Sequence, residues 1–273
     1  MPSFGGLFCR PPCLEARFPT LNLGLLHFDA VYVALMIAAI VSGFLLTRKF
    51  QQPLALSPSE RLGILIGAFC GAMLGAKLPF VLGDWEGLRS GAAWFSDGKT
   101  IMFGLVGGYA GVELAKAILQ VRVKTGDTFA VPVPLAVAVG RLGCFRAGCC
   151  YGTPTGLPWG VDFGDHIARH PTQLYEAAFH VTAAVILLLL LRKGLFRGQL
   201  FKLYLLAYFV FRFFTEFLRP EPRLWVDLTG YQWAALALIP TFALLWWNDA
   251  RVEGPAARWL SARVTEFPEL REK

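Results

Sequence analysis

The sequence predicts an all-α, polytopic membrane protein with seven transmembrane helices. Of its 273 residues, 55% are hydrophobic and 16% are charged, which is too apolar for an average soluble domain. The chain also has seven apolar runs, and with flanking residues each approaches the ~20 residues that cross a bilayer as a helix. The runs cover residues 30–46, 62–82, 101–119, 131–145, 174–191, 200–218 and 231–247. We expect one integral membrane domain over residues 1–273.

Basic residues gather in alternate connections between these runs, and this bias predicts the orientation. The first, third and fifth connections and the C-terminal tail are basic, whereas the second and fourth are mixed or acidic. Because Lys and Arg favour the cytoplasmic side, we expect an outer N-terminal segment, 1–27, and a cytoplasmic tail, 248–273. The formal charge of +7 is explained by this topology, and no basic stripe with exposed aromatics points to nucleic acid.

Arginines within apolar runs are the first sign of a site. Arg141 closes the fourth run, and Arg212 lies inside the sixth. Placing an arginine within a membrane span costs roughly 2.5–3.5 kcal/mol of insertion free energy, so such an arginine normally has an interaction partner or a functional role. Arg212, Glu216 and Arg219 are spaced to share one helical face. Guanidinium forks suit phosphate oxygens, although for Arg219 alone we favour snorkelling to water.

A second polar group opens the fifth run. Pro171 suits the first turn of a helix, and Gln173, Tyr175 and Glu176 follow within that turn or just after it. Glu176 is the most informative, because a carboxylate there needs an arginine. For His170, a titrating role and a hydrogen-bonded structural role are equally favoured. By the predicted topology, this group and the two arginine groups meet in the outer half of the membrane.

Weaker candidates lie in the second and third runs. Gly107 and Gly108 belong to a series of glycines at three- and four-residue steps, which is typical of close helix packing. Lys77 lies near the predicted outer end of the second run. Contact with an anion and snorkelling are equal alternatives for it.

Cys144, Cys149 and Cys150 follow Arg141 on the predicted outer side. Thiols there tend to oxidise, so a structural disulfide is the simplest expectation. We expect no metal, because the spacing lacks the paired C-x2-C of typical zinc sites. A nucleophilic thiolate activated by neighbouring arginines remains an alternative.

Three segments together resemble the prolipoprotein diacylglyceryl transferases. They read Gly140-Arg141-Leu142-Gly143 with Gly148 and Gly152, then Arg169-His170-Pro171-Thr172-Gln173-Leu174-Tyr175-Glu176, then Tyr208 to Arg219 with Phe211, Arg212 and Glu216 between. The resemblance implies a multi-pass enzyme of the bacterial inner membrane, with its site towards the outer face and no cofactor. Such an enzyme moves the diacylglyceryl group of phosphatidylglycerol to the lipobox cysteine of a preprolipoprotein and releases glycerol phosphate.

The resemblance also assigns roles. Arg141 and Arg212 match essential arginines of the family, and we expect His170 and Glu176 to act with them. The expected substrate-binding residues are Gly140, Gly143, Gly152, Gln173, Tyr175, Tyr208, Glu216, Arg219, Lys77, Gly107 and Gly108.

The sequence departs from the family pattern near the expected reaction centre. Val106, Cys144, Ala147 and Cys149 stand where the family has a histidine, two asparagines and a glutamate. Two alternatives to the transferase therefore remain. One is a divergent lipid-modifying enzyme that has a different acceptor and uses Cys149 or Cys150, and the other is a non-catalytic lipid-binding membrane protein.

Overall fold

The structure, a computed structural model, describes residues 20–23, 26–95 and 98–252. Most of the predicted N-terminal segment, 1–27, and most of the predicted tail, 248–273, therefore lie outside the described residues. The chain divides into two compact units. The first contains Leu54–Lys124 and Glu221–Ala237, and the second contains residues 20–53, Thr125–Pro220 and residues 238–252.

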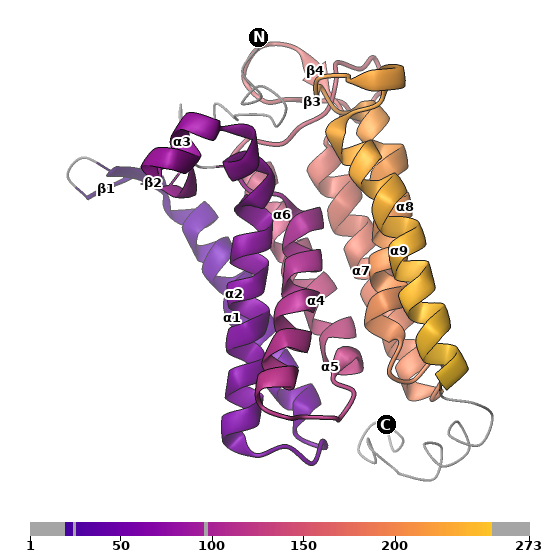
Figure 1. The fold of residues 1–273 in the computed structure, drawn as a ribbon. Coiled ribbons are helices and arrows are strands. Elements are labelled where there is room, and N and C mark those ends of the chain that lie inside the picture. Colours follow the sequence, from indigo (N-terminus) through magenta and orange to yellow (C-terminus); the bar gives the residue numbers. More distant parts are fainter. Residues whose placement is uncertain (1–19, 24–25, 96–97, 253–273) are drawn as a thin grey trace. The chain divides into compact units, whose positions relative to one another are not determined.

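The structure is mainly helical, and its long helices coincide with the predicted apolar runs (Figure 1). These are α1 (Ala30–Gln51), α2 (Pro58–Gly83), α4 (Ile101–Ile118), α6 (Pro132–Arg146), α7 (Thr172–Arg192), α8 (Leu200–Thr215) and α9 (Gly230–Val252). Within the described residues, five helical stretches are long and apolar enough to cross a membrane: α1, α2, α4, Gly126–Arg146 and α7. The chain is thus an α-helical membrane protein.

In the first unit, α2 and α4 pack with their backbones nearly in contact. A Cβ added to Gly67 would lie 2.6 Å from the carbonyl oxygen of Gly111, and one added to Gly75 would lie 2.9 Å from Gly107 Cα. Small residues at these steps allow such an approach, as the sequence predicted for the third run. Ser57 is the N-cap of α2 and forms a capping box with Glu60. After α2 the chain continues into α3 (Trp85–Ser90) and η2 (Ala92–Phe95).

In the second unit, α6 packs between α1 and α7, and α8 contacts α7. The predicted fourth run, 131–145, corresponds to α6, and a short helix, α5 (Gly126–Ala130), precedes it, with Val131 between them and Pro132 at the first position of α6. Proline suits that position because it lacks the N–H that a first helical turn leaves unpaired. Asp127 of α5 accepts hydrogen bonds from the backbone N–H groups of Gly198 (2.6 Å) and Leu200 (3.2 Å), which fixes the start of α8.

Short strands and turns connect the helices. β1 (Thr20–Leu23) pairs antiparallel with β2 (Leu26–Asp29), and β3 (Val161–Asp162) with β4 (Ala168–Arg169). The second pair lies in the segment between α6 and α7. At the end of α8 the chain tightens into η3 (Glu216–Leu218), and η4 (Trp225–Asp227) precedes α9.

Candidate active site

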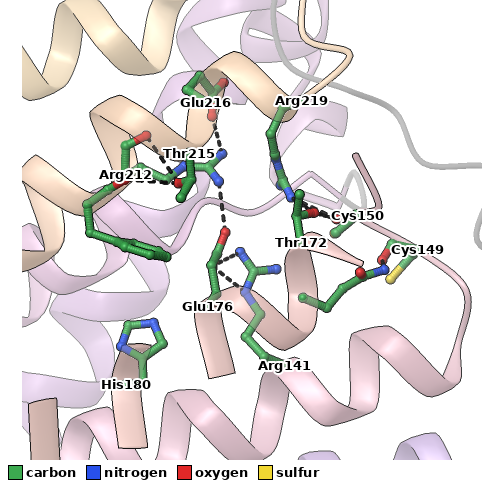
Figure 2. A network of polar contacts seen from close by, with 12 residues as sticks. Arg141, Cys149, Cys150, Thr172, Glu176, His180, Arg212, Thr215, Glu216 and Arg219 are labelled. Carbon is green, nitrogen blue, oxygen red and sulfur yellow. Dashed lines mark hydrogen bonds and ion pairs between the residues drawn. The ribbon is translucent and has the colours of Figure 1, made fainter. Parts of the chain in front are cut away.

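A buried carboxylate joins two of the predicted arginines (Figure 2). Arg141 of α6 donates from Nε to Glu176 Oε2 at 2.5 Å, and its Nη2 forms an ion pair with the same oxygen. Arg212 of α8 donates from Nη1 to Glu176 Oε1 at 2.8 Å. All three side chains are buried. The prediction that Glu176 pairs with an arginine is therefore confirmed, and each of its oxygens has an arginine partner.

Arg212 extends the network by one more residue. Its Nη2 lies 2.7 Å from Glu216 Oε2, so its two terminal nitrogens serve two different carboxylates. Glu216 follows Arg212 by four residues and is fully buried in η3. Such forked pairing is a property of the planar guanidinium, which presents its donors in a fixed geometry. The functional role favoured for Arg212 stays a prediction, since a salt bridge with Glu216 was its structural alternative and is present.

The expectation that Arg219 snorkels to water is wrong. Its side chain is buried, and Nη1 donates to the carbonyl oxygen of Cys150 at 2.7 Å and to Thr172 Oγ1 at 3.2 Å. The helix changes to a 3-10 turn at Glu216 and ends at Arg219, and this directs the arginine towards the loop after α6. Its buried Nε has no hydrogen-bond partner among the described residues.

The net charge of this network is positive. With the two glutamates ionised, the three described arginines leave one positive charge in a buried setting. A buried charge is costly unless it is paired, so a site of this kind favours a monoanion with oxygen acceptors.

The loop after α6 is held against α7 through its backbone. Gln173 Nε2 donates to the carbonyl oxygen of Cys149 at 2.5 Å, and Thr172 Oγ1 donates to that of Cys150 at 2.8 Å. Gly152 closes the loop with a backbone hydrogen bond to His170 at 2.8 Å. A Cβ on Gly152 would lie 2.5 Å from the carbonyl oxygen of Leu218 and 2.8 Å from His170 Cβ. Glycine is therefore required there by packing.

Two glycines of the same motif are expected to respond differently to alanine. Gly152→Ala should lower the free energy of unfolding by about 1–3 kcal/mol, because its methyl group would meet a backbone carbonyl. Gly140→Ala should be neutral or stabilising, since a Cβ there has nothing within 4 Å and alanine favours a helix interior. Thermal unfolding in detergent micelles measures both, and equal melting temperatures would contradict the assignment. Gly143 is intermediate: its added Cβ would meet the flexible end of Met36 at 2.5 Å.

His170 and Tyr175 form a separate pair beside the network. His170 Nδ1 lies 3.3 Å from the Tyr175 hydroxyl group, which also accepts a hydrogen bond from Trp159 Nε1 at 2.9 Å. The backbone of His170 bonds to Gly152 and to Thr153. His170 therefore has a clear structural role, and its titrating role stays a prediction.

The sequence analysis missed His180, which is fully buried one helical turn from Glu176. Its Nδ1 lies 3.0 Å from the Tyr204 hydroxyl group, and its ring lies 5.1 Å from the ring of Tyr208. Its Nε2 is buried with no hydrogen-bond partner among the described residues. The signal was present in the sequence, since a lone histidine in an apolar run is uncommon. Tyr208, a predicted substrate-binding residue, packs in this aromatic cluster.

The predicted disulfide is not formed: Cys144, Cys149 and Cys150 are present as thiols rather than in a disulfide. Their sulfur atoms lie within 4.8 Å of one another. Hydrogen bonds from the Cys144 and Cys149 thiols, aided by the charges of Arg141 and Arg219, hold the pKa of the Cys150 thiol well below its usual range. A nucleophilic or redox role for the cluster stays a prediction.

The remaining candidates lie in the first unit. Lys77 donates a hydrogen bond to the carbonyl oxygen of Trp94, which ties α2 to η2. Gly107 lies against Gly71 and Gly75 of α2, whereas Gly108 makes ordinary contacts. These contacts explain Lys77 and Gly107 by packing, and their substrate role stays a prediction. Val106 of α4 is half-buried, and Ala147 ends α6.

Comparison with known proteins agrees with the residue motifs. The sequence model of the prolipoprotein diacylglyceryl transferase family matches residues 21–248. A phosphatidylglycerol–prolipoprotein diacylglyceryl transferase of Clostridium tetani is 34% identical over 202 residues, which are 70% of this chain and 81% of the relative. The enzyme of that name from Geobacter sulfurreducens is 31% identical over 252 residues, 89% of this chain and 93% of the relative. No solved structure matches the chain. By both the family match and these relatives, the chain belongs to the prolipoprotein diacylglyceryl transferase family.

Proposed function

We propose that the chain is a transferase that moves the diacylglyceryl group of phosphatidylglycerol to the cysteine thiol of a prolipoprotein. The names of its relatives give the reaction, and family membership over most of the chain carries it here. The single structural observation that supports it is the buried network of Arg141 and Arg212 around two carboxylates, with a third buried arginine, Arg219, on the neighbouring loop. This network suits a phosphodiester, which carries one negative charge.

The reaction exchanges one bond for another. The thiol sulfur bonds to the terminal glycerol carbon of the diacylglyceryl group, and the bond from that carbon to the phosphate oxygen breaks. The electron pair leaves with glycerol phosphate, and the thiol proton passes to a base or to water. Negative charge therefore grows on the phosphate, and arginine N–H donors placed beforehand in a buried site stabilise it.

The residues of the network divide into two roles. We assign phosphate contact to Arg141 and Arg212, assisted by Arg219, whose buried Nε is unpaired among the described residues. Both oxygens of Glu176 accept hydrogen bonds from arginines, so we assign it to positioning rather than proton transfer. His170 or water then accepts the thiol proton. A chain built this way needs no cofactor.

The proposal includes the full topology. We assign seven membrane spans, by adding α8 with η3 and α9 to the five stretches that meet the length and hydropathy required. The 16 residues of α8 fall short of ~20, but η3 continues it to Leu218. The basic-residue pattern supports an outer N-terminus, a cytoplasmic C-terminus and a site towards the outer face of the bacterial inner membrane. We treat residues 1–273 as one integral domain.

Reporter fusions test this orientation. After Trp247, a reporter that works only in the cytoplasm should be active. Near Asp162, only a reporter that works after export should be active. Both sites follow from the charge of the flanking connections. A fusion after Lys193, in a basic connection, serves as the internal control and should match the Trp247 fusion. The reverse pattern would place the arginine network on the cytoplasmic side and overturn the proposed localisation.

The activity is tested with the purified chain, phosphatidylglycerol vesicles and a synthetic lipobox peptide. Mass spectrometry should detect a diacylglyceryl thioether on the peptide and glycerol phosphate in solution. A peptide with Ser in place of the lipobox Cys is the control. Glycerol phosphate release with no change to the peptide would favour a different acceptor. A diacylglyceryl adduct on the chain itself, lost in Cys149→Ser or Cys150→Ser, would favour the cysteine nucleophile. Lipid binding without either product would favour the non-catalytic alternative.

A further inference from the structure

Three thiols converge at the end of α6 without any role in the proposed transfer. Cys144 lies in the last turn of α6, and Cys149 and Cys150 lie in the loop that follows. Their three sulfur atoms are all within 4.8 Å of one another. The group contains no histidine and no carboxylate. A ligand of this cluster would therefore be held through sulfur.

The loop backbone brings the cluster together before any ligand binds. Gly148 and Cys150 both have left-handed backbone angles, with φ of 63° and 62°, and they turn the chain back over α6. The backbone N–H of Cys149 donates to the carbonyl oxygen of Cys144 at 3.1 Å. The carbonyl groups of the two loop cysteines are in turn held by buried side chains of Gln173, Thr172 and Arg219. The positions of the sulfur donors are thus set by protein contacts.

The separations suit a single ion bound by three sulfurs. Sulfurs that surround an ion in one plane at about 2.3 Å lie about 4.0 Å apart, so the observed cluster has to contract by less than about 1 Å. Cys149 is buried and the other two cysteines are half-buried, so an ion can reach the cluster while water is largely excluded.

The donor set selects the kind of ion. Thiolates prefer soft metals, among which Cu(I) and Zn(II) are the common choices. Structural Zn(II) sites are almost always tetrahedral with four protein ligands, and this cluster offers three. Cu(I) is stable with three sulfur ligands. Three thiolates and one Cu(I) leave negative charge, which is opposed by the positive charge of Arg219, whose Nη1 donates to the carbonyl oxygen of Cys150.

We propose that Cys144, Cys149 and Cys150 form a binding site for one Cu(I) ion. Binding releases the thiol protons to solvent and involves no change of oxidation state. The sequence alone predicted no metal, because the spacing of these cysteines lacks the paired C-x2-C of typical zinc sites. The site does not depend on the proposed transferase activity, and its test uses no activity measurement.

The test is an anaerobic Cu(I) titration of the reduced, purified chain against a chromophoric Cu(I) chelator. Because Cys9 and Cys13 lie outside the described residues, Cys9→Ser/Cys13→Ser is the reference protein. It should retain one Cu(I), with three sulfur neighbours by X-ray absorption. Cys144→Ser, Cys149→Ser and Cys150→Ser in that background should each weaken binding by more than about 100-fold, beyond the about 10–100-fold typical of outer-shell changes. Cys70→Ser, which removes an exposed thiol of α2, is the matched control and should bind like the reference.

A second measurement keeps all three cysteines and therefore does not depend on the folding of a cysteine variant. In the reference protein, one equivalent of Cu(I) should protect Cys144, Cys149 and Cys150 from alkylation, as read by peptide mass spectrometry, while Cys70 stays reactive. The proposal is overturned if Cu(I) is not retained, if the three variants bind like Cys70→Ser, or if alkylation is unchanged. Stronger retention of Zn(II) than of Cu(I), or a disulfide within the cluster of protein prepared anaerobically, would also overturn it.

Discussion

Glu176→Gln is expected to lower the free energy of unfolding by about 3–5 kcal/mol, the typical cost of removing one partner of a buried ion pair. Glu176 bonds Arg141 with one oxygen and Arg212 with the other, and all three side chains are buried. Glutamine keeps the shape but loses the charge, and its amide nitrogen would face an arginine donor. Arg212 would then keep Glu216 as a carboxylate partner, whereas Arg141 would lose its ion pair with Glu176.

The loss can be measured by SDS-induced unfolding in mixed micelles. Glu113→Gln is the matched control, since it removes the carboxylate of an exposed pair with Lys116 and should cost no more than about 1 kcal/mol. Transfer to the lipobox peptide should fall at least about 100-fold in Glu176→Gln, because both arginines would lose their position. If the two variants were equally stable, the network would not support the fold as described.

The arginine network was predictable because its residues break an apolar pattern. Arg141, Glu176 and Arg212 each lie in or beside a run of hydrophobic residues, and a charge there needs a partner. The approximate depth of these three side chains in the membrane could be predicted from the helix boundaries, which depend on local sequence. Pairing across three helices was inferred from topology, and the contacts confirm it.

The errors arose where tertiary contacts override local pattern. Arg219 was expected to reach water, but the chain tightens at Glu216 and the loop after α6 supplies a carbonyl partner. Neither the 3-10 turn nor the path of that loop is encoded by residue spacing. His180 was missed although a lone histidine in an apolar run is uncommon, and its burial beside Tyr204 is explained by a hydrogen bond.

The cysteines show a different limit of sequence analysis. Oxidation tendency depends on the compartment, and this favoured a disulfide, whereas the three cysteines are not in one. Their mutual distances depend on the left-handed turn at Gly148 and Cys150, and no spacing rule for metal sites describes that turn. The sequence could therefore identify the three thiols but not their convergence.

Arg212→Lys is expected to lower kcat/KM for diacylglyceryl transfer by about 10²–10³-fold, similar to the loss of one preorganised donor at a developing anion. Lysine keeps the charge, but one ammonium group cannot hold Glu176 and Glu216 as the two ends of the guanidinium do at 2.8 and 2.7 Å. Arg219→Lys is the matched control. Within the part of the chain that the structure describes, a single nitrogen of Arg219, Nη1, makes both of its hydrogen bonds, and an ammonium group can replace it.

We therefore expect Arg219→Lys to raise the activation free energy by less than about a tenth of the increase caused by Arg212→Lys. A tenfold loss of kcat/KM corresponds to about 1.4 kcal/mol. Both variants are assayed for glycerol phosphate release and peptide lipidation after gel filtration shows that each is folded. Because the phosphate belongs to the donor lipid and not to the peptide, the loss of kcat/KM in Arg212→Lys should persist at a saturating concentration of peptide. Wild-type turnover in Arg212→Lys would remove this arginine from the phosphate site, and an equal loss in both variants would show that the effect does not depend on the fork by which Arg212 contacts two carboxylates.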